Sequence, residues 1–153
     1  MATKEQGKWR RELEDKWSRQ TLQHNYTVLP TLLFTYASEL HKGSRRDEPI
    51  SPAQQAVLFH LLTYWWFADN PPVVSKARLA ESLGISARQV QRHLRALEEA
   101  GLIETRFPNR PGRNPNESTF NGLIGKLEKI AEAHGKRKKR EIYERSREVK
   151  SMS

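Results

Sequence analysis

The chain has 153 residues and no cysteine, and its 27 Lys and Arg outnumber its 18 Asp and Glu, which gives a formal net charge of +9. The length suits one domain with appendages, and the missing cysteines exclude disulfides, iron–sulfur clusters, cysteine-ligated zinc fingers and cysteine nucleophiles. The excess positive charge favours nucleic acid as a partner.

Residues 1–25 are polar apart from a few side chains, of which Trp9, Leu13 and Trp17 recur every four residues. This spacing places the three on one face of a predicted helix. The stripe either packs against the body of the protein or contacts a second copy or another partner. A disordered arm is the third alternative.

Residues 26–41 begin like a strand and then take on a helical pattern. Pro30 suits the first turn of a helix, where its missing N–H is not needed. The apolar side chains that follow recur at helical spacing, namely Leu32, Leu33, Tyr36 and Leu40. A polar loop, residues 42–50, follows this segment.

A strong helix start comes next. Ser51 suits an N-cap, Pro52 the first helical position, and Gln54 the third residue of a capping box. These residues predict a helix over 52–67, whose broad apolar face makes it the centre of the core. Val73 and Val74 are expected to form a short strand.

Residues 75–103 predict two short helices joined by a tight turn. Ser75 caps the first, through about Leu83, and Gly84 suits the left-handed position that ends a helix. Ser86 caps the second, residues 87–100, which Gly101 ends. A strand over 102–107 is expected next. Two helices around a glycine-containing turn are typical of a helix-turn-helix, in which the first helix braces the second against the DNA major groove.

The second helix has one apolar and one basic face. Val90, Leu94 and Leu97 recur at spacings of four and three, so they face the core. With about 100° per residue, the opposite face carries three arginines, Arg88, Arg92 and Arg95, with Gln89 and Gln91 on its flanks. Arginine can bind guanine, and glutamine adenine, through two hydrogen bonds.

The blocks LAESLGIS and RQVQRHLRALEEAGLI in this segment resemble the helix-turn-helix of bacterial winged-helix DNA-binding proteins. The chain is also similar to small helix-turn-helix proteins of bacteria, phages and plasmids. The resemblance implies a mostly α fold with a small β-hairpin wing, and double-stranded DNA as the ligand.

Residues 108–119 hold three prolines, one glycine and three asparagines, so they suit a hairpin loop. Phe107 and Phe120 are expected to close its base. Arg110 and Arg113 near its tip suit contacts with the DNA backbone or minor groove, although a plain exposed loop remains the alternative. The candidate DNA-binding residues are therefore Lys76, Arg78, Ser86, Arg88, Gln89, Gln91, Arg92, Arg95, Arg110 and Arg113.

Residues 122–134 predict an amphipathic helix that either packs on the core or forms a dimer contact. Residues 135–153 form a basic tail with five consecutive cations at 136–140. The tail is expected to be a frayed helix or a disordered arm that follows DNA phosphates, or only a solubilising segment. The resulting division is an N-terminal helix at 1–25, the winged domain at 26–121, the helix at 122–134 and the tail.

No pattern points to catalysis, a metal site or a cofactor. The five histidines share no metal-ligand spacing, and His60 in its apolar helix suits a structural role. Because the first residues contain no apolar signal core, we expect a cytoplasmic, nucleoid-associated protein. The sequence predicts a sequence-specific DNA-binding homodimer, most simply a transcriptional repressor. The alternative is a non-catalytic subunit of a nucleoprotein assembly with a protein or RNA partner.

Overall fold

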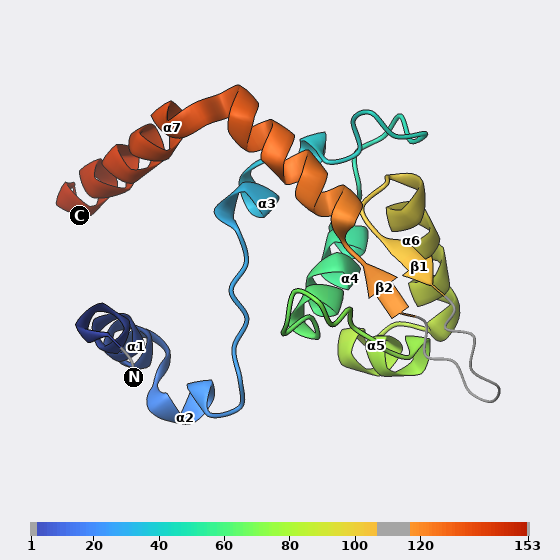
Figure 1. Cartoon of the computed structure of the whole chain (residues 1–153), viewed down its shortest axis with the longest axis horizontal. Coiled ribbons are helices and arrows are strands. Elements are labelled where there is room, and N and C mark those ends of the chain that lie inside the picture. Colours follow the sequence, from blue (N-terminus) through green and yellow to red (C-terminus); the bar gives the residue numbers. More distant parts are fainter. Residues whose placement is uncertain (1–2, 107–116, 153) are drawn as a thin grey trace.

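The computed structural model describes residues 3–106 and 117–152. Its elements, in chain order, are α1 (Lys4–Trp17), α2 (Arg19–Leu22), α3 (Thr31–Thr35), the 3-10 helix η1 (Ala37–Glu39), α4 (Pro52–Thr63), α5 (Lys76–Leu83), α6 (Ala87–Glu99), β1 (Glu104–Arg106), β2 (Glu117–Thr119) and α7 (Asn121–Ser151). The fold is mostly helical with one small antiparallel hairpin (Figure 1), which confirms the expected winged helix-turn-helix class.

Serine caps start the helices of the central body where the sequence predicts them. At α4, Ser51 Oγ accepts a hydrogen bond from the backbone N–H of Gln54 at 3.2 Å, and Gln54 Oε1 accepts one from the backbone N–H of Ser51 at 2.8 Å. At α5, Ser75 Oγ accepts from the backbone N–H of Arg78 at 3.1 Å. Each cap satisfies backbone N–H groups that the first helical turn leaves without a partner.

Helix α4 ends at Thr63 and not at residue 67 as the apolar pattern predicts. The backbone N–H groups of Tyr64 and Trp65 bond three residues back, which tightens the last turn. The indole Nε1 of Trp66 then donates to the carbonyl oxygen of Thr63 at 3.0 Å. This bond satisfies a carbonyl at the helix end, and Trp65 leaves the helix to pack on Phe120, with ring centroids 5.1 Å apart.

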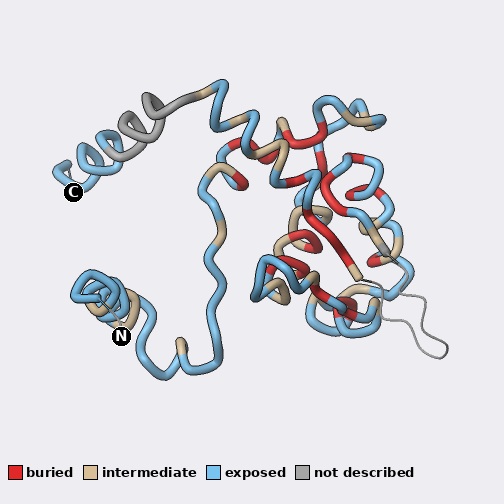
Figure 2. Tube along the Cα trace, in the orientation of Figure 1, coloured by how far each residue is buried: buried red, intermediate tan, exposed pale blue. Residues whose placement is uncertain are grey.

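The core lies where α4, α5 and α6 pack together. Buried residues gather on the facing sides of these helices (Figure 2), and the fully buried leucines and valines include Leu58, Leu61, Leu79, Val90 and Leu97. Burial of these apolar side chains is the main free energy that fixes α6 against the body.

The hairpin joins the end of α6 to α7. Strand β1 pairs with β2 in antiparallel register, with Thr105 opposite Ser118. The strand expected at Val73 and Val74 is reduced to a single bridge between Val73 and Glu117. Phe120 is buried as expected for the base of the hairpin, whereas Phe107 lies outside the described residues.

Helix α7 packs its first half on the core and continues to Ser151 as one helix, so the helical alternative for the tail is the one observed. Leu123 is buried, and Leu127 and Ile130 are partly buried against the core. Lys126 Nζ donates to the carbonyl oxygen of Lys42 at 2.8 Å. Burial, with a smaller contribution from the charge of Lys129, lowers the pKa of Lys126.

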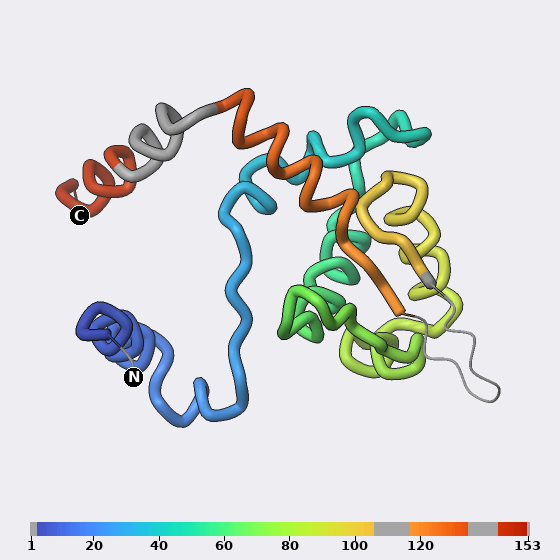
Figure 3. The backbone as a smooth tube through the Cα atoms, viewed as in Figure 1, coloured from blue at the N-terminus to red at the C-terminus, as the bar shows by residue number. Residues whose placement is uncertain are grey.

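Helix α1 does not pack on the body, contrary to the first of the expected alternatives. It has no buried residue, and Trp9 and Trp17 are 68 % and 56 % exposed. An extended segment that follows α2 separates α1 from the rest of the chain, as the backbone trace shows (Figures 1 and 3). A contact with a second copy or another partner remains open for this helix.

Candidate nucleic-acid interface

Helices α5 and α6 form the two arms of a helix-turn-helix. Gly84 ends α5 with φ +67°, a left-handed conformation that glycine adopts without a Cβ penalty. The backbone N–H of Ile85 then bonds to the carbonyl oxygen of Ala80 at 3.1 Å. Ile85 is partly buried against the core, so the turn is anchored and the start of α6 is fixed relative to α5.

The two faces of α6 lie as the sequence predicts. Val90 and Leu97 have no exposed surface, and Leu94 is partly buried. Arg88, Arg92 and Arg95 are exposed on the other side. Among the described residues, no ion pair or hydrogen bond joins these three guanidinium groups to the protein. The arginine stripe, Arg88, Arg92 and Arg95, is therefore free for an external ligand.

The first turn of α6 is closed by a second capping box. Ser86 Oγ accepts a hydrogen bond from the backbone N–H of Gln89 at 3.1 Å, and Gln89 Oε1 accepts from the backbone N–H of Ser86 at 2.9 Å. Gln89 is exposed, but its side-chain oxygen Oε1 already accepts the capping hydrogen bond. Of its side-chain amide, only Nε2 therefore remains available to DNA. The sequence analysis did not assign this role to Gln89, although the S-x-x-Q spacing, the same as at Ser51 and Gln54, could have predicted it.

Gln91 lies on the flank of α6 that faces the hairpin, next to Arg95, and both residues line one hollow. Gln91 Oε1 is buried and has no hydrogen-bond partner in the described part of the chain. The hollow, of about 460 Å³, is also lined by Leu79, Ile103 and Ser118. A contact between Gln91 and a base would require its side chain to leave this hollow.

The hairpin is tied to α6 by a contact that the sequence analysis missed. Thr105 Oγ1 on β1 donates a hydrogen bond to Glu98 Oε1 on α6. The residues are seven apart with a turn between them, so periodicity gives no signal for this pair. The bond fixes the base of the hairpin relative to the arginine stripe. Arg110 and Arg113, which the sequence places near the tip of the loop, lie outside the described residues.

The N-terminus of α5 supplies two further cations. Lys76 is partly buried and Arg78 is exposed within the first helical turn. The N-terminal end of a helix carries partial positive charge and free N–H groups, which favour phosphate. Lys76 also lines the same hollow as Arg95 on α6, so this end of α5 lies close to the basic face of α6.

Other kinds of site are not apparent in residues 3–106 and 117–152. No group of three or more His, Asp or Glu in these segments could hold a metal ion, and no helix there is long and apolar enough to cross a membrane. His60 Nδ1 lies 2.9 Å from the carbonyl oxygen of Ala56, one turn earlier in α4. This contact agrees with a structural role for His60.

Comparison with known families agrees with this geometry. Residues 48–103 match the model of a family described as a helix-turn-helix domain. The match spans α4, α5 and α6 and ends just before β1. A comparison with curated proteins finds no match to the chain.

Proposed function

The chain carries a helix-turn-helix domain at residues 48–103, and from this we propose that it is a sequence-specific protein that reads double-stranded DNA with α6. The domain itself indicates DNA binding. The DNA major groove as the binding site, the contact residues and the regulatory role are our proposals.

The observation that carries the proposal is the arginine stripe. Arg88 and Arg95 are seven residues apart, which is about 10 Å along a helix, or about three base-pair steps of DNA. Val90 and Leu97 are fully buried on the opposite side, so the stripe cannot turn inward without exposing the core. Guanidinium groups presented in this way can bind guanine O6 and N7 in the major groove.

The candidate DNA-binding residues fall into proposed base contacts and proposed backbone contacts. Arg88 and Arg92 are the proposed main base contacts, Gln89 adds a single donor through Nε2, and Gln91 contributes only if it leaves the hairpin side. The proposed backbone contacts, which set register without reading sequence, are Lys76, Arg78, Ser86, Arg95, Arg110 and Arg113.

The biological role that suits this interface best is a transcriptional regulator, most simply a cytoplasmic, nucleoid-associated repressor that blocks a promoter. One arginine stripe reads only a few base pairs, so a homodimer on a two-fold site would supply the missing specificity. The basic second half of α7 would add phosphate contacts.

A second candidate role rests on α1. Its Trp9 and Trp17 are more than half exposed, and α1 lies apart from α4 (Figure 1), which suits a helix that binds another protein. In that case the chain is a non-catalytic subunit of a nucleoprotein assembly, such as one that acts in plasmid or phage replication or in mobile-element defence.

Selection of bound duplexes from a random DNA pool tests the proposed function. We expect enrichment of a palindromic site by the wild-type chain and none by a variant with Arg88→Ala and Arg92→Ala. A pool that stays unenriched with the folded wild-type chain contradicts sequence-specific binding. That result would favour the assembly role, with RNA or another protein as the partner.

A further inference from the structure

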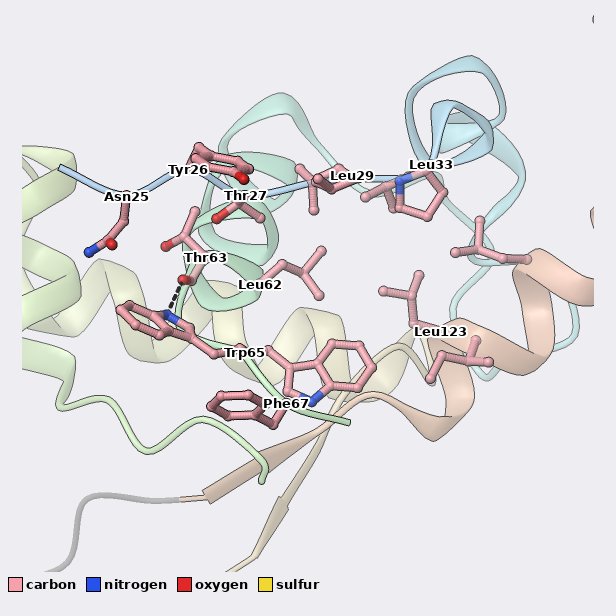
Figure 4. A pocket seen from close by; sticks show the side chains of 15 residues that line it. Asn25, Tyr26, Thr27, Leu29, Leu33, Leu62, Thr63, Trp65, Phe67 and Leu123 are labelled. Atoms are coloured by element: carbon pink, nitrogen blue, oxygen red, sulfur yellow. Dashed lines mark hydrogen bonds between the residues drawn. The ribbon is translucent and has the colours of Figure 1, made fainter. Parts of the chain in front are cut away.

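An apolar groove lies on the side of the protein away from the arginine stripe. It is formed by the extended residues 25–30, the end of α4 and the start of α7, and it encloses about 520 Å³. Tyr26 and Leu29 lie along one side and Trp65 and Phe67 along the other, with Leu62 between them (Figure 4). We call this hollow the aromatic groove.

The aromatic side chains of the groove are held in place although they are exposed. Trp66 is 63 % exposed, yet its indole Nε1 is fixed by the bond to Thr63. Phe67 is 65 % exposed in a turn that the bond from the Asn70 N–H to the Phe67 carbonyl closes at 3.0 Å. Because the only polar atom of the Trp66 side chain is already satisfied, what it presents to solvent is apolar. Contiguous exposed apolar surface of this kind marks an interaction site.

Helix α1 carries a matching surface. Trp9, Leu13 and Trp17 lie within an arc of about 80° on one face of α1, and we call them the tryptophan stripe. An isolated helix of 14 residues is only marginally stable in water, since helices in proteins gain most of their stability from packing an apolar face. Helix α1 therefore needs a surface on which its tryptophan stripe can pack.

We propose that the tryptophan stripe of one copy binds in the aromatic groove of a second copy, and that the second copy returns the same contact. The result is a two-fold dimer in which each chain exchanges its N-terminal helix with the other. This specifies the dimer contact within the proposed function. Its test uses no DNA, so its failure and a failure of DNA binding are distinguishable.

The path of the chain favours exchange over a contact within one copy. Residues 25–30 themselves form one wall of the groove. They run along it in extended form and lead to α2 and α1, which lie apart from α4 and α7 (Figure 1). The chain direction thus carries α1 away from its own groove.

The surface available also matches what a dimer needs. Five aromatic side chains of the stripe and the groove, namely Trp9, Trp17, Tyr26, Trp66 and Phe67, are each more than half exposed. At about 150–250 Å² per aromatic side chain, covering them buries roughly 600 Å² per contact. Two reciprocal contacts bury roughly 1,200 Å², which reaches the range of stable specific interfaces.

Light scattering and sedimentation of the full chain without DNA test the proposal. We expect a mass of twice 17.8 kDa for the wild type. Replacing both Trp9 and Trp17 by Ala should weaken the dimer at least about a hundredfold, as loss of two central tryptophans does at interfaces. The matched control is Arg11→Ala with Asp15→Ala, which changes the opposite face of α1 and leaves the net charge unchanged. This control should remain a dimer.

Mixing two defective variants distinguishes exchange from a simple contact between two α1 helices. The variant with Trp9→Ala and Trp17→Ala keeps an intact groove, and a Trp66→Glu variant keeps an intact stripe. Each should be monomeric alone and still folded by circular dichroism, because the replaced side chains lie outside the core. Their mixture restores one of the two contacts, so it should form a heterodimer that is weaker than the wild-type dimer and is detectable by native mass spectrometry at high protein concentration. A monomeric wild type, a dimer that survives loss of both tryptophans, or a mixture without heterodimer would each overturn the proposal.

Discussion

Ser86 and Gln89 bond to each other's backbone N–H groups at the first turn of α6, at 3.1 Å and 2.9 Å. Arg88 lies between them in the sequence, so the pair that starts the helix also orients the first arginine of the stripe. Ser86 and Gln89 are both candidate DNA contacts and structural residues, and their effects on stability and on binding should be measured separately.

Replacing Ser86 by Ala should lower the free energy of unfolding by about 1 kcal/mol, because the cap loses its acceptor. Urea unfolding without DNA measures this cost. Ser82→Ala is the matched control, since Ser82 is exposed inside α5 and alanine is a better helix former. Equal stability of Ser86→Ala and the wild type would contradict a structural role for the cap.

Replacing Leu97 by Ala should lower the free energy of unfolding by roughly 2–5 kcal/mol, because the change leaves a cavity in the core. Leu97 has no exposed surface, whereas Glu99, two residues later on the same helix, is exposed. Glu99→Ala should change stability by less than about 0.5 kcal/mol. If chemical denaturation gave the two variants the same stability, the burial assigned to the underside of α6 would be wrong.

Gly122 and Gly125 in α7 should respond in opposite ways to alanine. A Cβ at position 122 would overlap the carbonyl oxygen of Gly101, where α7 crosses the end of α6, and the backbone cannot yield cheaply. A Cβ at position 125 meets nothing within 4 Å. We expect Gly122→Ala to destabilise the fold, and Gly125→Ala to stabilise it by about 0.5–1 kcal/mol. Thermal unfolding of both variants tests the close approach of α7 to the end of α6. A Gly122→Ala variant as stable as the wild type would contradict that approach.

Local features of this fold could be predicted from the sequence because neighbouring residues decide them. Ser51 with Gln54, Ser75 and Ser86 act as caps, and Gly84 takes the left-handed conformation that is expected of a glycine at the end of a helix. The exposed arginines of α6 also follow from helical phase alone, since the buried side chains are strictly periodic.

Features that depend on tertiary neighbours could not be predicted in this way. Gln91 lies about 100° from Val90 around the helix, and only the position of the hairpin decides that its side chain is covered. Helix α4 ends early because the Trp66 indole bonds back to Thr63, which no apolar pattern reveals. The continuation of α7 past residue 134 reflects the helix propensity of Lys, Arg and Glu, which agrees equally with a frayed tail.

The five-cation block at 136–140 should steepen the salt dependence of DNA binding. Replacing these residues by Gln keeps the helix propensity and removes five charges. The slope of log affinity against log salt concentration should therefore become shallower by about 0.9 for each phosphate contact that is lost. Arg10→Gln with Arg11→Gln in α1 is the control, with no expected change of slope. An unchanged slope for the five-residue variant would exclude the block from the DNA interface.

The most direct test of the central claim is the affinity of Arg92→Ala for two duplexes, the selected site and a scrambled sequence of the same length. Arg92 is exposed in the middle of the arginine stripe. We predict a loss of about 1–3 kcal/mol on the selected site with little change on the scrambled one. Arg19→Ala, which removes an exposed cation from α2, serves as the charge control and should affect neither. An equal loss on both duplexes would contradict the claim that α6 reads base sequence.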